Sequence, residues 1–117
     1  MPFIRCEIAR KLPTGAAADI DVDFLKMMER VASKPPEYVM IQLRDGQRIH
    51  FRGETRKAAF VELKQLGSLA LAQKEELSRD ICSILDKRAG IPPDHCYITF
   101  AEFDRENWGH DGKTFAG

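Results

Sequence analysis

Four stretches of the chain alternate between apolar and polar side chains, the period expected of half-buried β-strands. They are residues 2–9, 38–44, 59–66 and 96–103. Pro2 shares the apolar phase of the first stretch with Ile4, so the start of the chain is predicted to lie in the sheet, on its core side. Proline is tolerated at the first position of a strand, where it need not donate a hydrogen bond.

Two longer stretches have the helical period of 3.6 residues and predict helices at about 16–32 and 72–89. The first has its expected inward stripe at Ala17, Ile20, Phe24, Met28 and Val31, and the second at Leu77, Ile81, Ile84 and Leu85. A double proline follows each helix and stops it, because proline cannot continue a helix. Gly90 is well placed to cap the second helix.

The remaining segments are polar and rich in turn signals. Asp45-Gly46 predicts a turn, residues 49–51 a short returning strand, and residues 52–57 an exposed connector. Residues 104–117 form a polar tail that carries Trp108 and Phe115.

Strand, helix, double-proline break and strand occur twice, at 2–44 and 58–103, with local echoes offset by 57 residues. A strand–helix–strand unit of this length places its strands parallel through a right-handed crossover. Two units predict an α/β (α+β) domain over residues 1–117: a four-stranded mixed sheet with two helices on one face. The other sheet face is expected to be apolar in alternate positions and uncovered, which favours a homo-oligomer.

Composition excludes several classes of protein. Lys+Arg and Asp+Glu are 18 each, so the chain lacks the basic field of a nucleic-acid binder. No apolar run reaches the length of a membrane span, and no secretory signal is recognisable, so a cytoplasmic location is expected. The three cysteines are scattered, which indicates a reducing compartment and small buried thiols without disulfides. The histidines lack metal-ligand spacing, so no metal site is expected.

Met1-Pro2 is the main candidate for chemistry. Met1 precedes a small residue, so its removal by an aminopeptidase is expected and would leave Pro2 as a free secondary amine. An α-amino group has a pKa near ~8, and burial or a nearby cation can make it a neutral base at pH 7. The alternative is that Pro2 only permits the removal of Met1. For Lys34 the alternative is a surface cation favoured by the helix dipole.

An ordered set of short motifs resembles the macrophage migration inhibitory factor family of the tautomerase superfamily. The motifs are Met1-Pro2, Lys34-Pro35-Pro36-Glu37-Tyr38-Val39-Met40, Phe51 with Gly53, Leu66-Gly67, Gly90-Ile91-Pro92-Pro93-Asp94, Tyr97-Ile98, Trp108-Gly109 and Thr114-Phe115. Each is weak alone, but together they cover the whole chain in order. The resemblance implies the double β-α-β fold and a homotrimer with a proline in each subunit-interface pocket.

The resemblance also implies an activity without a cofactor: keto–enol tautomerisation of small aromatic α-keto acids such as phenylpyruvate, or of dopachrome-like substrates. Pro2 would be the general base, and Lys34 would bind the substrate carboxylate while lowering the pKa of Pro2. The implied substrate-binding positions are Leu66, Tyr97, Thr99, Trp108, Phe115, Tyr38 and Lys64. Tyr97 would come from a neighbouring subunit. For each aromatic side chain, ordinary packing in a core or interface is an equal alternative.

The chain departs from the family pattern at the wall and rim of the implied pocket. Thr99 stands where the family has asparagine, Lys64 lies near a position that is often histidine, and His110 replaces a tryptophan. Because these changes spare Pro2 and Lys34, they bear on substrate preference rather than on the class of reaction. The CxxC motif of some relatives is absent, which argues against a thiol oxidoreductase.

Two other functions are compatible with the residues. One is a cytokine-like or other protein-binding module with a vestigial pocket, a receptor or other protein as its partner, and secretion without a signal peptide. The other is a superfamily member with hydrolytic or decarboxylating chemistry, which needs arginines and an acid beside the proline. Arg5, Arg52 and Glu7 cannot be assigned to such a site from the sequence, so this function ranks last.

Overall fold

The computed structural model describes residues 1–117, and the chain forms a single four-stranded sheet with two helices. The sheet strands are β1 (Pro2–Ile8), β2 (Met40–Arg44), β5 (Ala59–Leu66) and β6 (Cys96–Phe103), and the helices are α1 (Ala16–Ala32) and α2 (Leu71–Ala89). These bounds confirm the strands and helices predicted from periodicity, to within two residues at each end. No helix is long and apolar enough to cross a membrane.

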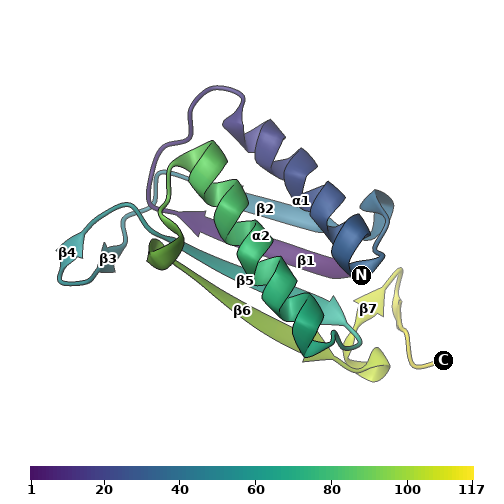
Figure 1. Ribbon diagram of the computed structural model, residues 1–117. Coiled ribbons are helices and arrows are strands. Elements are labelled where there is room, and N and C mark those ends of the chain that lie inside the picture. The colour runs from purple at the N-terminus through teal and green to yellow at the C-terminus, as the bar shows by residue number, and fades with distance from the viewer.

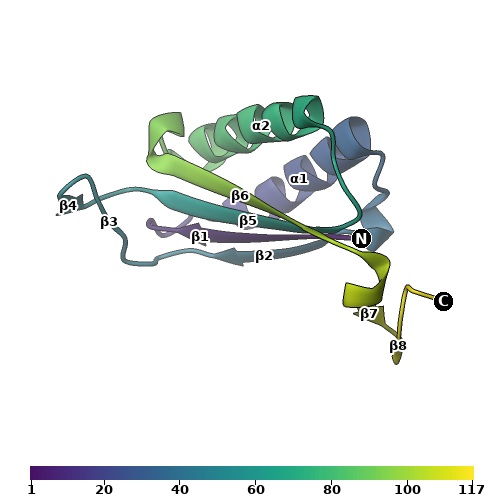
Figure 2. The same cartoon turned by 90° about the horizontal axis from the view of Figure 1, so that it is seen from below.

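The sheet has the mixed topology predicted for two β-α-β units. Its strand order is β2-β1-β5-β6, with β1 parallel to β2, β5 parallel to β6, and the two central strands antiparallel. Both helices cross the same face of the sheet side by side (Figure 1). Seen along the sheet, the opposite face carries no helix (Figure 2). The fold class expected from the repeat is therefore confirmed.

The hydrophobic core lies between the sheet and the helices. The apolar phase of β1 is buried there, as predicted, together with Ala59, Val61 and Leu63 of β5, and α2 contributes Leu77, Ile81 and Leu85. The expected inward position of Ala17 is wrong: Ala16 is buried instead, and Ala17 is exposed. Met27 is buried as well as Met28, so the buried face of α1 is rotated relative to the predicted stripe. Ala17 lies outside that face.

The internal repeat is retained in the structure at the ends of the two helices. Each helix ends in a left-handed residue, Ser33 with φ 55° and Gly90 with φ 67°. A single 3-10 turn follows each, at Pro36–Tyr38 and Pro93–His95, before the next strand begins. Both pairs are separated by the offset of 57 residues seen in the sequence.

The uncovered sheet face is not apolar throughout, so that prediction is wrong. Its middle is a polar row in which Arg5 lies between Gln42 and Glu62 on the neighbouring strands. Glu7 accepts from Arg5 at 3.1 Å and from Arg44 at 3.4 Å. These residues occupy the outward phase of their strands, and charged side chains there stay solvated. Apolar side chains gather instead towards the two ends of the face, including Met40, Phe60 and Tyr97.

Two hairpins project from opposite ends of the sheet (Figure 2). One pairs β3 (His50–Phe51) with β4 (Glu54–Thr55), so part of the predicted exposed connector is a strand. The other, in the tail, pairs β7 (Gly109–His110) with β8 (Lys113–Thr114). These strands have two residues each, which is too few for a periodic signal. For this reason only the β3–β4 hairpin was predicted, and only in part.

The cysteines are free thiols, but they are not all buried. Cys6 lies in the core, and burial raises the pKa of its thiol to about 12. Cys82 on α2 and Cys96 on β6 are half-buried, against the prediction. The Cys82 thiol lies 3.9 Å from the carbonyl of Pro93, which also accepts the backbone N–H of Cys96. Burial, and then the adjacent Cys82, raises the pKa of the Cys96 thiol far above its usual range.

Candidate functional site

Pro2 begins the sheet and is buried beneath the helix layer. It lies opposite Gln65 in the antiparallel pairing of β1 with β5. Met1 precedes it, and the Met1 carbonyl accepts a hydrogen bond from the backbone N–H of Leu66 at 3.4 Å. The chain start is therefore fixed at the end of β5. While Met1 is attached, the Pro2 nitrogen is a tertiary amide and has neither a hydrogen nor basicity.

Lys34 reaches the same end of the sheet because α1 ends abruptly before it. Ser33 adopts the left-handed conformation, and its N–H and that of Lys34 bond the carbonyls of Glu29 and Met28. The bond from Ser33 to Glu29 is the 5→1 bond of an αL cap, with which the helix ends at a left-handed residue. Lys34 is half-buried and acts on the chain start: burial first, and then the charge of Lys34, lowers the pKa of the Met1 amino group.

A hollow of about 280 Å³ opens beside the chain start. Its lining is Met1, Glu37, Tyr38, Val39, Met40 and His110. Tyr38, expected at the rim, is half exposed there, and His110 also lines the hollow. Met40 and Glu37 were not among the predicted site residues. The parallel pairing of Phe3 with Met40 brings β2 alongside the chain start. This register cannot be predicted from the hydrophobic periodicity of the sequence.

The residues of β5 reach the site from different faces of the sheet. The N–H of Leu66 holds Met1, so Leu66 lies at the site through its backbone. Lys64 pairs with Phe3 and Ala101 and shares the uncovered face with them. Because neighbouring residues of a strand point to opposite faces, Lys64 lies across the sheet from the Pro2 ring. A single chain therefore does not aim Lys64 at Pro2.

The tail adds aromatic side chains next to the hollow. The ring of Phe115 stacks on His110 with centroids 6.1 Å apart and an interplanar angle of 23°. The Phe115 N–H donates to the carbonyls of Arg105 and Trp108, which fold the tail back on itself. The ring of Trp108 meets that of Phe103 edge-on at 5.6 Å. Phe115 thus reaches the hollow through His110, whereas Trp108 packs against the end of β6.

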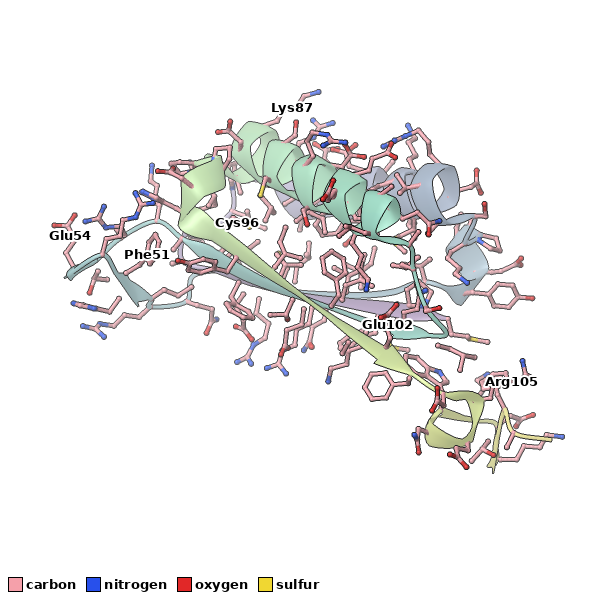
Figure 3. All side chains as sticks on the ribbon, turned by 60° about the horizontal axis from the view of Figure 1, so that its bottom comes forward. Phe51, Glu54, Lys87, Cys96, Glu102 and Arg105 are labelled. Atoms are coloured by element: carbon pink, nitrogen blue, oxygen red, sulfur yellow. The ribbon has the colours of Figure 1, made fainter.

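Tyr97 lies far from Pro2 within one chain, and Thr99 lies nearer the middle of the sheet. Tyr97 is aligned with Phe60, and Phe60 with Glu7, five residues along β1 from Pro2. At the rise of a strand that separation is about 16 Å. Tyr97 is 62% exposed, and its ring meets Phe51 of the projecting hairpin edge-on at 5.7 Å. Figure 3 shows Phe51 at the end of the molecule opposite Arg105 of the tail.

The geometry therefore brings together part of the expected site. Pro2, Lys34, Tyr38, Leu66 and Phe115 converge at one end of the sheet. No cluster of three or more His, Cys, Asp or Glu side chains is arranged to hold a metal. The chemistry that this arrangement can support is proton transfer by an amine at the chain start, next to a cation that can hold an anion.

Comparisons with known proteins point to one family. The sequence model described as macrophage migration inhibitory factor (MIF) matches residues 1–116. A macrophage migration inhibitory factor homolog from Trichinella spiralis is 31% identical over 103 residues, which are 85% of this chain and 90% of that protein. The factor from Xenopus tropicalis is 31% identical over 94 residues, 80% of this chain and 82% of its own.

Solved structures give the same result. A macrophage migration inhibitory factor-like protein from Entamoeba histolytica superposes with a TM-score of 0.88 at 28% identity, covering 97% of this chain and 98% of that one. The homologue from Prochlorococcus marinus has a TM-score of 0.89, also at 28% identity, over 97% of this chain and 99% of its own.

Proposed function

This chain belongs to the macrophage migration inhibitory factor family, with the fold of the tautomerase superfamily, and we propose that it is a cofactor-independent keto–enol tautomerase. Its substrates would be small aromatic α-keto acids of the phenylpyruvate type, with dopachrome-type compounds as a second class. Pro2, freed by removal of Met1, is the general base. The observation that carries this proposal is the burial of the chain start together with the field of Lys34.

The proposed reaction moves one proton through the Pro2 nitrogen. The neutral amine takes a proton from the carbon next to the carbonyl or from the enol oxygen, and its conjugate acid returns the proton to the other atom. The carboxylate binds to the ammonium of Lys34. Burial and a nearby cation both favour the neutral amine, which keeps Pro2 a base near pH 7.

The hollow beside the chain start supports an aromatic substrate. Tyr38, Val39 and Met40 give it an apolar wall, and His110, stacked on Phe115, closes one side. An aromatic ring placed there gains apolar contact while the keto acid points towards Pro2 and Lys34.

We further propose that the active assembly is a homotrimer in which Tyr97 and Thr99 reach the site from a neighbouring subunit. Within one chain Tyr97 lies about 16 Å from Pro2 along the strands, at the exposed opposite end, and Thr99 lies about 10 Å from it. Strands β2 and β6 are both edge strands, free to pair, and the two hairpins project from opposite ends. Head-to-tail contacts of this kind form a ring when the rotation between neighbouring subunits closes, as it would in a trimer.

The direct test is turnover by the processed protein. Intact mass first establishes that Met1 is absent, and ultraviolet absorbance then follows enol–keto conversion of phenylpyruvate. We expect conversion, and we expect Pro2→Gly to abolish most of it. Pro13→Gly, the same substitution in the loop before α1, is the matched control and should keep its activity. Absence of conversion by the fully processed protein would refute the proposed function.

The second candidate function is protein binding, which the relatives' name, macrophage migration inhibitory factor, and the exposed Tyr38, Met40 and Leu71 favour. Loss of turnover in Pro2→Gly with partner binding intact would separate the two roles. Hydrolytic chemistry is disfavoured by placement. Arg5 and Glu7 pair with each other on the uncovered face, and Arg52 pairs with Asp94 at 3.0 Å.

A further inference from the structure

Gln65 is the one polar residue in the buried interior. Its side chain is 1% exposed, and its Oε1 atom has no hydrogen-bond partner. A buried acceptor without a donor is costly, and native proteins almost always satisfy such groups. An apolar side chain of similar size would avoid the cost at this position, so the free acceptor calls for a physical explanation.

The nearest neighbours of Gln65 on the sheet are Pro2 on β1 and Glu102 on β6. The bond from Leu66 N–H to the Met1 carbonyl makes Pro2 and Gln65 a non-hydrogen-bonded pair, the kind in which facing side chains are closest. Both residues are buried on the helix-covered face.

Glu102, on the other side, already has partners of its own. Its carboxylate accepts the Leu69 N–H at 2.6 Å and the Lys74 ammonium at 3.0 Å. As a carboxylate it has no hydrogen to donate to Gln65. Of the two sheet neighbours, the chain start is therefore the one that can supply a donor.

Removal of Met1 creates that donor. In the unprocessed chain the Pro2 nitrogen is an amide without a hydrogen, so it can donate nothing. The processed chain has one N–H on the neutral amine and two on its conjugate acid. Removal of Met1 thus gives Pro2 at least one hydrogen-bond donor where it had none. The neighbouring Oε1 atom of Gln65 is an acceptor without another partner.

We propose that Gln65 is a positioning residue whose Oε1 accepts a hydrogen bond from the Pro2 amine once Met1 is removed. This inference deepens the proposed function and rests on it for its catalytic meaning. The bond would fix the direction of the remaining amine hydrogen or lone pair towards the hollow. It would also stabilise the conjugate acid formed when the base takes its proton.

Several charged or titratable groups lie around the Pro2 amine. Lys34 comes from the end of α1, and Glu37, Tyr38 and His110 from around the hollow, whereas Lys64 is separated from the amine by the sheet. The Lys74–Glu102 pair lies beyond Gln65. Burial and Lys34 lower the pKa of an amine at this place, whereas an acceptor for the charged form raises it. Gln65 therefore opposes Lys34 and keeps the amine from becoming too weak a base.

The first test is an NMR titration of Pro2 in the processed protein, which needs no substrate. In Gln65→Leu we expect the pKa of Pro2 to fall by about one pH unit, because the conjugate acid loses its acceptor. Leu63→Met, a core change two residues away, is the control for repacking and should leave that pKa in place. If Gln65→Leu does not fold, Gln65→Met replaces it as the variant that lacks the acceptor. An unchanged pKa in the Gln65 variant overturns the proposal.

The second test compares the melting temperatures of processed protein with those of a form carrying extra residues before Met1, in which Pro2 stays an amide. Gln65→Leu should stabilise the extended form, where the acceptor is unused, and stabilise the processed form less or destabilise it. An equal change in both forms overturns the proposal. If both tests give the expected results but the processed wild-type protein does not turn over phenylpyruvate, only the proposed tautomerase function is refuted. The failure of one proposal can therefore be told from the failure of the other.

Discussion

At the scale of single residues, Lys34 has two effects that separate in experiment. Its charge lies close enough to the chain start to lower the pKa of an amine there, after burial has done so. The same ammonium is available to a substrate carboxylate, because Lys34 is half-buried and makes none of the ion pairs found elsewhere on α1. The first effect changes the pH dependence of catalysis, and the second changes the affinity for substrate.

Replacing Lys34 by methionine, which keeps the length of the side chain, should change both quantities. Loss of a nearby cation favours the charged amine, so the pKa of Pro2 rises and the acid limb of kcat/KM moves to higher pH. KM for phenylpyruvate should rise about tenfold, as expected for loss of a charge-assisted contact. Rate profiles over pH measure both. Lys26→Met on the exposed side of α1 is the control, and an acid limb that stays in place would contradict the assigned role.

Residue positions were predictable from the sequence where they follow from element ends. Pro2 begins a strand and Lys34 follows a helix stop, and both positions are readable from local patterns. The hollow was not, because Met40 and Glu37 enter it through the register of β1 with β2. Gln65 alternates in phase with Ala59, Val61 and Leu63, but alternation does not show whether a buried amide has a hydrogen-bond partner.

At the scale of elements, the helices of the two repeat copies end in the same backbone conformation but with different residues. Both end in a left-handed residue, which is glycine in the second copy and Ser33 in the first. A side chain in this conformation costs about 1–2 kcal/mol relative to glycine. The cost is borne at the turn that delivers Lys34 to the chain start.

Ser33→Gly should therefore stabilise the protein by about 1 kcal/mol, with a rise in Tm of about 4 °C. Thermal unfolding followed by circular dichroism measures it. Ser78→Gly, inside α2, is the control of opposite sign, because glycine in a helix interior is destabilising. A Tm lowered by Ser33→Gly would mean that the serine hydroxyl contributes more than the backbone strain costs.

Element boundaries were predictable because the hydrophobic periodicity ends where the proline, glycine and other turn residues begin. The start and end of β6 were predicted to the residue, since strict alternation runs from Cys96 to Phe103. The pairing of Glu54–Thr55 was missed because two residues carry no period. The uncovered face was misjudged for another reason: the outward phases contain Arg5, Glu7 and Glu62, whose charges outweigh the aromatic residues at the ends.

At the scale of the whole molecule, the single chain holds the two halves of the proposed site at opposite ends. Pro2 and the hollow lie at one end, and the exposed Tyr97 lies at the other, beside the β3–β4 hairpin. A ring of identical chains would join each Pro2 end to a neighbour's Tyr97 end. A mixture of defective chains can detect that arrangement.

Pro2→Gly chains and Tyr97→Ala chains should each be weakly active alone, and a refolded mixture should regain activity. With random assembly at equal amounts, about a quarter of the sites combine an intact Pro2 with an intact neighbouring Tyr97. Turnover at about that fraction of the wild-type level is the expected result, with light scattering reporting the trimer mass. A mixture no more active than the average of its parts would place the whole site within one subunit.

The internal repeat bears on how such a chain could have arisen. Doubling a half-length gene would give two copies of every position, with Ala59 as the counterpart of Pro2 and Ile91 as that of Lys34. Both counterparts are buried in the core. The second copy begins in mid-chain, where its first nitrogen is an ordinary peptide group, so selection for a free amine could act on the first copy alone. Fusion would thus have halved the number of reactive chain starts and released the other half of the sequence to serve packing.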